Sequence, residues 1–154
     1  MRFGKIYFVC IMNIWDNIID KPIGEYNEAD LFSQIKLSNY VDLVKSEDKM
    51  SRWDCYSAHF NHRIELKCRG KHYDDLLIEK SKYDYMVGKA HDNLDVPMYI
   101  CSTPKGIYCF NLLKIEPNWF VQKHNKTTQF KNTKKVDKLV GNMSIHDEHC
   151  HLYL

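Results

Sequence analysis

The first periodic pattern in the chain is an apolar stripe over 28–44, in which hydrophobic residues recur at helical spacing. Asn27 stands just before the stripe as a suitable N-cap, and acidic residues occupy the first turn. The pattern predicts a helix over 28–44 with one apolar and one polar face. Its apolar positions are Leu31, Ile35, Leu37, Val41 and Val44.

Two strand-like segments follow, over 52–60 and 63–69, and Asn61-His62 between them suits a tight turn. Side chains alternate between the two faces of a strand, so the second segment divides into an apolar face and a charged face. The apolar face carries Ile64, Leu66 and Cys68, and the charged face carries Glu65, Lys67 and Arg69. The pattern predicts a β-hairpin with a charged row on one side.

A second, partly apolar helix is predicted from residue 75 or 76 to residue 91. The short apolar run 98–101 then predicts a buried strand, and a turn over 103–106 leads into a returning strand over 107–113. The resulting order is helix, strand, strand, helix, strand, strand. This order predicts an α/β or α+β fold in which helices pack against a sheet.

The length of 154 residues fits one domain, and 44% hydrophobic with 27% charged residues excludes a disordered or fibrous chain. Within a single domain over 1–154 we expect three parts. They are an N-terminal arm over 1–24, a core over 28–113 and a C-terminal extension over 114–154.

Neither a membrane span nor a disulfide framework is expected. The six cysteines occur singly, without a C-x-x-C pair, which indicates free thiols in a reducing cytoplasm. The apolar run 6–12 follows Arg2 and Lys5, but it is short and no small-residue cleavage site follows it. Met12 is an alternative start. No stretch approaches the roughly 18 to 20 apolar residues that cross a bilayer.

The net charge of +2 conceals a strongly basic segment. Residues 105–138 hold eight lysines against two acidic residues, a local excess of +6, with aromatic residues interleaved among the lysines. This composition is typical of a surface that contacts phosphate. A solvated lysine-rich face above an aromatic core would have the same composition, and the sequence leaves both interpretations open.

The triplet Glu65-Leu66-Lys67 places a carboxylate and an ammonium side by side on one face of a strand. Asp54 lies on the preceding strand of the predicted hairpin, so an antiparallel return could bring it near Glu65. Two converging carboxylates suit Mg²⁺, which takes oxygen ligands, and a neighbouring lysine can assist an attacking water. By spacing alone, a surface ion pair is the better explanation of the triplet.

Four features together resemble the PD-(D/E)XK nuclease superfamily: Asp54, the run 63–69 with Glu65 eleven positions after Asp54, His72-Tyr73, and the segment 76–84. The resemblance covers about residues 28–113 and is strongest to small nuclease-like proteins of bacteriophages and bacteria. It implies a restriction-endonuclease-like core, with a mixed central sheet flanked by helices. The predicted order of elements agrees with that core.

Carried over by residue, the resemblance makes Asp54 the first carboxylate of the motif, Glu65 the second and Lys67 the lysine. It adds Glu28 from the first helix as a further metal ligand, with Glu25 behind it. Trp53 stands where the motif has proline, which makes the match less specific. The implied activity is Mg²⁺-dependent hydrolysis of phosphodiester bonds, with Mn²⁺ as a substitute.

The resemblance also implies a nucleic-acid substrate, which we expect to be DNA, in the cytoplasm of a bacterial or phage-infected cell. The expected phosphate-contacting residues are Lys80, Lys82, Lys123, Lys126, Lys131, Lys134 and Lys135. Whether the substrate is a duplex, a junction, a single strand or RNA stays open. Double-strand cleavage would require two sites, so a homodimer is open as well.

Two alternatives compete with a nuclease. The first is a catalytically inactive nuclease-fold module that binds nucleic acid or acts as an inhibitor, because fold does not imply function. The second is a zinc site in the cluster His146, His149, Cys150 and His151. Adjacent residues on a strand point to opposite faces, so this cluster is better explained as a tail strand with partly exposed histidines. His72 is likewise expected to be a turn histidine.

Overall fold

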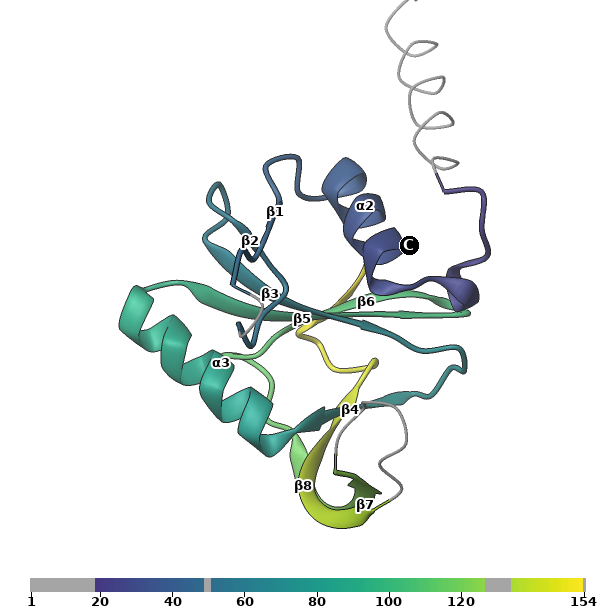
Figure 1. Cartoon of the computed structure of the whole chain (residues 1–154), viewed down its shortest axis with the longest axis vertical. Coiled ribbons are helices and arrows are strands. Elements are labelled where there is room, and N and C mark those ends of the chain that lie inside the picture. The colour runs from purple at the N-terminus through teal and green to yellow at the C-terminus, as the bar shows by residue number, and fades with distance from the viewer. Residues whose placement is uncertain (1–18, 49–50, 127–133, 154) are drawn as a thin grey trace, which may run out of the picture.

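The computed structural model describes residues 19–48, 51–126 and 134–153, and within them the chain forms two sheets and two α-helices (Figure 1). In chain order the elements are η1 (Ile23–Glu25), α2 (Glu28–Ser38), β1 (Val44–Lys45), β2 (Cys55–Ser57), β3 (His62–Cys68), β4 (Asp75–Glu79), α3 (Lys80–Asn93), β5 (Val96–Thr103), β6 (Gly106–Asn111), β7 (Asn118–Asn125), β8 (Lys135–Ser144) and β9 (Cys150–Leu152).

The larger sheet has six strands in the order β1-β2-β3-β5-β6-β9. β3 and β5 are parallel and their neighbours are antiparallel, so the sheet is mixed. The smaller sheet, β4-β8-β7, is antiparallel. The predicted class, a mixed central sheet flanked by helices, is confirmed. The predicted order of elements is incomplete, since β1 and β4 interrupt it.

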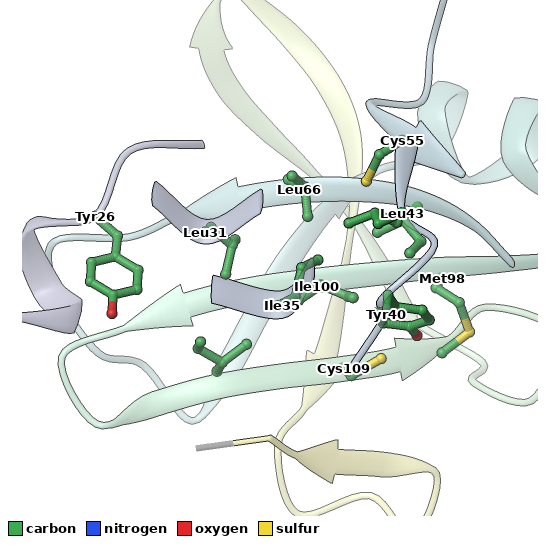
Figure 2. Close-up of a cluster of buried hydrophobic side chains, with 12 residues drawn as sticks. Tyr26, Leu31, Ile35, Tyr40, Leu43, Cys55, Leu66, Met98, Ile100 and Cys109 are labelled. Carbon is green, nitrogen blue, oxygen red and sulfur yellow. The ribbon is translucent and has the colours of Figure 1, made fainter. Parts of the chain in front are cut away.

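Two apolar cores cover the two faces of the larger sheet. α2 packs Leu31 and Ile35 against Leu66 and Ile100 on one face (Figure 2). On the other face, α3 and the smaller sheet enclose a second core that includes Phe110. Figure 1 shows the resulting layers, with α2 on one side of the larger sheet and α3 with β4 and β8 on the other. The charged face of β3 points toward this second side.

The first helix begins as predicted and ends earlier. Asn27 and Asp30 form a capping box, in which the Asn27 side chain accepts from the Asp30 backbone N–H at 2.8 Å and the reciprocal bond measures 3.0 Å. The prediction that the helix continues to residue 44 is wrong. The chain turns after Ser38 to bury Leu43, and this leaves Val41 78% exposed and moves Val44 into β1.

The predicted helix over 75–91 is wrong in its first turn. Residues 75–79 form β4, where Leu76 and Ile78 are buried at alternate positions, and the whole strand pairs with β8. α3 starts only at Lys80. A strand of five residues directly before a helix has too few alternations to separate it from helical spacing, and its partner lies about sixty residues away. The predicted strand 52–60 shortens to β2, because the chain already turns over 58–61, where the Asn61 N–H donates to Ala58 O.

The segment after residue 114 belongs to both sheets. β8 is the central strand of the smaller sheet, and β9 pairs with β6 at the edge of the larger one. The cysteines at 55, 68, 101, 109 and 150 are free, while Cys10 lies outside the described residues. Among the described residues, no helix is long and apolar enough to cross a membrane.

Gly141 in β8 provides a stability test of this packing. A Cβ at this position would lie 2.5 Å from Pro117 Cβ and 2.8 Å from the Trp119 ring, so Gly141→Ala should destabilise the fold by about 1–3 kcal/mol. Gly88 in α3 is the matched control, because nothing lies within 4 Å of an added Cβ. Gly88→Ala should stabilise by about 0.5–1 kcal/mol through helix propensity. Urea unfolding of both variants measures the effects, and equal values would contradict this packing.

Candidate active site

A cleft of about 400 Å³ opens between β3 of the larger sheet and β4, β7 and β8 of the smaller sheet. The charged row of β3 forms its floor, with Glu65, Lys67 and Arg69 in succession. Lys82 enters from α3, and Lys138 enters from β8. The cleft therefore combines one buried carboxylate with four cationic side chains.

Glu65 is the least exposed carboxylate that lines this cleft, at 9% of its full exposure. Its Oε2 accepts a hydrogen bond from Lys82 Nζ at 3.0 Å. Burial and, after it, the negative charge of Asp54 together raise the pKa of Glu65 to about 7 against the opposing effects of Lys82 and Lys67. The group is thus close to half-ionised near neutral pH and lacks full charge compensation from the protein.

Asp54 is positioned by the hairpin itself. β2 pairs with β3 only as far as Cys55 and Ile64, so the backbone N–H of Leu66 finds no partner strand. Asp54 Oδ2 accepts this N–H at 2.7 Å, and the Asp54 backbone N–H donates to Ile64 O at 2.9 Å. The Asp54 carboxylate is therefore anchored at the edge of β3, beside the residue that follows Glu65.

Glu28 lies at the start of α2 and borders a shallow pocket with Lys67 and Cys68. Desolvation and the charge of Asp54 raise the pKa of Glu28, and Lys67 and Lys82 lower it. Its charge is thus coupled to the same set of groups as Glu65. Glu25, the second candidate from this region, is exposed in η1 and is absent from the residues that shape either pKa.

The donor set fits a hard divalent cation in its chemistry. Asp54 and Glu65 offer carboxylate oxygens, and burial together with the charge of Asp54 raises the pKa of Glu65, a shift that a bound cation would oppose. Across the part of the chain that is described, no three His, Cys, Asp or Glu side chains lie together closely enough to hold a metal. Mg²⁺ commonly uses only one or two carboxylates together with waters and substrate phosphate, so these two residues would suffice.

The predicted phosphate-contacting lysines that the structure describes lie in three places. Lys82 lines the cleft. Lys80 instead pairs with Asp84 and lies 5.1 Å from the Trp119 ring. The remaining described lysines of the set lie near the end of the β7-β8 hairpin, outside the lining of the cleft, and Lys131 falls outside the described residues. The hairpin lysines are Lys123, Lys126, Lys134 and Lys135.

Three cleft residues were not singled out from the sequence. Arg69 continues the charged row of β3, so the period of two could have added it to the site. His124 and Lys138 reach the cleft only because β7 and β8 pair with β4, and Lys138 Nζ lies 2.8 Å from Glu79 Oε1 at its rim. No local sequence signal marks this second wall.

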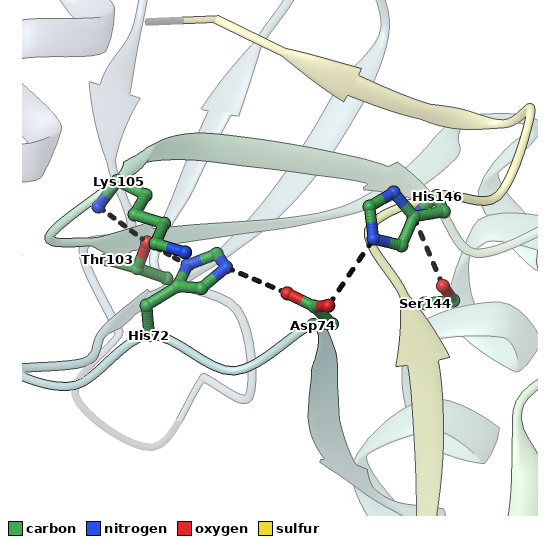
Figure 3. Close-up of polar contacts among 6 residues, drawn as sticks. All are labelled: His72, Asp74, Thr103, Lys105, Ser144 and His146. Carbon is green, nitrogen blue, oxygen red and sulfur yellow. Dashed lines mark hydrogen bonds and ion pairs between the residues drawn. The ribbon is translucent and has the colours of Figure 1, made fainter.

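The histidines at 72, 146, 149 and 151 are not among the residues that line the cleft. His72 Nδ1 lies 2.9 Å from Thr103 Oγ1, and its Nε2 lies 3.1 Å from Asp74 Oδ1 (Figure 3). His146 Nε2 lies 3.5 Å from the other Asp74 oxygen. His149 is beside Glu148, and Cys150 and His151 lie on β9. These contacts connect β4 to the β5-β6 hairpin and to the end of β8, away from Glu65.

Comparison with known proteins finds distant likenesses among solved structures. No protein-family model matches the chain, and no curated protein matches it. The chain is similar to the Holliday junction resolvase Hjc of the archaeal hyperthermophile Archaeoglobus fulgidus, with a TM-score of 0.46 and 12% identity. The match covers 77% of this chain and 88% of that chain. At this identity and TM-score, the likeness assigns no role to any residue.

Proposed function

We propose that the chain is a divalent-metal-dependent nuclease that hydrolyses phosphodiester bonds, with DNA as the expected substrate. The observation that carries this proposal is the buried Glu65, coupled to Asp54 and set among cationic side chains in an open cleft. A structural ion pair would neutralise its carboxylate, whereas Glu65 keeps a raised pKa despite Lys82. Perturbed carboxylates in clefts are typical of functional sites.

Each side chain has a role that follows from its position. Asp54 and Glu65 would hold Mg²⁺ or Mn²⁺, with Glu28 close enough to influence the charge of the site. The cation supplies activation of the attacking water and neutralises charge at the scissile phosphate. Lys67 lies two residues after Glu65 on the same face of β3, where its ammonium can orient the water and stabilise negative charge that develops on the phosphate.

The positive side chains of the cleft would hold the nucleic-acid backbone. Arg69 directly after β3, Lys82 in α3 and Lys138 in β8 line the same cleft as Glu65, so a phosphate between them would be contacted from both walls. Arg69 can in addition present two parallel N–H donors to phosphate oxygens. The hairpin lysines beyond the cleft would extend this contact along the strand.

Removal of the metal is the direct test. Supercoiled plasmid incubated with the full chain should be nicked in Mg²⁺ or Mn²⁺, and EDTA should reduce nicking to background because Asp54 and Glu65 alone cannot activate water. Restored Mg²⁺ should restore nicking. Equal nicking with and without EDTA would contradict a metal-dependent reaction. Retention of plasmid without nicking in either metal would favour the inactive nucleic-acid-binding module.

A further inference from the structure

A row of stacked cationic and aromatic side chains lies beside the cleft. The Arg52 guanidinium carbon is 4.8 Å from the centre of the Tyr85 ring. Tyr85 stacks on Trp53, with ring centroids 6.2 Å apart and planes inclined by 21°. The Arg63 guanidinium follows, 4.4 Å from the Trp53 ring and 5.4 Å from the Tyr56 ring. We call these five residues the stacking row.

The stacking row is joined to the candidate active site at two points. Trp53 directly precedes Asp54 in the chain. Lys82 Nζ donates both to Glu65 Oε2 at 3.0 Å and to the Arg52 carbonyl oxygen at 2.7 Å. Tyr85 lies three residues after Lys82 in α3, so both side chains project from the same side of the helix. A nucleotide next to the scissile phosphate would therefore be within reach of the row.

The two ends of the row differ in how firmly they are held. Arg63 forms an ion pair with Asp95, a carboxylate that is only 5% exposed, which fixes the inner end. Arg52 at the outer end is exposed, and the Tyr85 and Trp53 rings are half-buried. Neither Arg52 nor Tyr85 belongs to either apolar core. Arg63 is thus held in place, while the Tyr85 ring at the other end of the row is accessible. A planar group such as a nucleobase could stack on this ring.

We propose that the stacking row binds an unpaired nucleobase of the strand whose phosphate occupies the cleft. This inference rests on the proposed nuclease function and names its substrate class, a single-stranded or locally unpaired nucleic acid. The base would stack on Tyr85, where the Arg52 guanidinium now lies, and Arg52 would cover the other face of the base. Aromatic rings and guanidinium planes are the groups that bind unstacked bases, whose faces a duplex conceals.

Binding in EDTA tests the stacking row separately from cleavage. The probes are a fluorescein-labelled oligothymidylate of about 20 nucleotides and a blunt duplex of the same length, measured by anisotropy at one salt concentration. The wild type should bind the oligothymidylate more tightly than the duplex. Tyr85→Ala should weaken oligothymidylate binding roughly 5- to 150-fold, as expected for loss of one stacked base, and should change duplex binding less than about 2-fold.

Two further variants protect the result against a folding artefact. Tyr85→Phe keeps the ring and should bind both probes like the wild type. Arg52→Lys keeps the charge on an exposed side chain but lacks the planar face, so it should weaken oligothymidylate binding selectively. An unchanged ratio of the two affinities in Tyr85→Ala and Arg52→Lys would overturn the stacking row. Absence of nicking in Mg²⁺ or Mn²⁺ would instead overturn the nuclease proposal, because these affinities are measured without metal.

Discussion

Glu65→Gln is expected to reduce metal-dependent plasmid nicking by roughly 10²- to 10³-fold or more. The amide has nearly the same shape and its oxygen can still accept the Lys82 hydrogen bond, so the local packing should persist. What it removes is the negative charge that, together with Asp54, would hold the cation at the phosphate. The measurement is the initial nicking rate in saturating Mg²⁺, with plasmid retention as a parallel assay that should show little change.

A matched control is Glu148→Gln, since the Glu148 side chain is 86% exposed and lies near β9, away from the cleft. This variant should nick at the wild-type rate. Lys67→Ala supplies an independent check because it leaves both carboxylates in place, and it too should slow nicking by removing the ammonium beside Glu65. Wild-type rates in both Glu65→Gln and Lys67→Ala would exclude the catalytic assignment.

The predictable half of this site is the half built by local structure. The period of two along β3 separates Ile64 and Leu66 from Glu65 and Lys67, and the structure has the same separation. The turn at Asn61, with a φ of 57° that suits asparagine, brings β3 back alongside β2, so that Asp54 lies at the edge of β3. A hairpin and its alternation depend on neighbouring residues, so a single sequence contains the information.

The other half depends on pairings between distant segments. β4 is recognisable as a strand only through β8, and Lys138 reaches the cleft only because β8 lies between β4 and β7. The lysine-rich segment contains five expected phosphate contacts, Lys123, Lys126, Lys131, Lys134 and Lys135, and Lys138 is not one of them. The structure divides it into Lys138 at the cleft and a group of lysines near the hairpin end, a division that composition alone does not contain.

Burial is the second property that the sequence does not reveal. An exposed Glu-Leu-Lys triplet would be a weak surface ion pair. The Glu65 side chain is instead buried in the cleft between β3 and the smaller sheet. This burial raises its pKa, which favours a functional site over a surface ion pair. The environment of Tyr85 is likewise not evident from the sequence. Its spacing in the predicted helix suggests a core position, but it lies outside both apolar cores and stacks on Trp53.

The raised pKa of Glu65 also predicts a large effect on stability. A carboxyl with a pKa of about 7 in the folded state and about 4.5 in the unfolded state binds more protons when folded. Its contribution to stability is complete below pH 4.5 and is lost as the pH rises through about 7. The loss approaches about 3 kcal/mol by pH 8. Glu65→Gln cannot ionise, so its stability advantage over the wild type should grow from near zero at pH 4.5 to as much as about 3 kcal/mol at pH 8.

Urea unfolding in EDTA at the two pH values measures this difference, and Glu148→Gln should stay within about 0.5 kcal/mol of the wild type at both. If the free energies of unfolding of Glu65→Gln and the wild type differ by the same amount at every pH, ionisation of Glu65 does not destabilise the folded state. Mg²⁺ adds the decisive comparison. A cation beside Glu65 favours its ionised form, so at pH 8 Mg²⁺ should raise the Tm of the wild type and leave that of Glu65→Gln nearly unchanged. The carboxylate that destabilises the metal-free fold would then be the one that binds the metal.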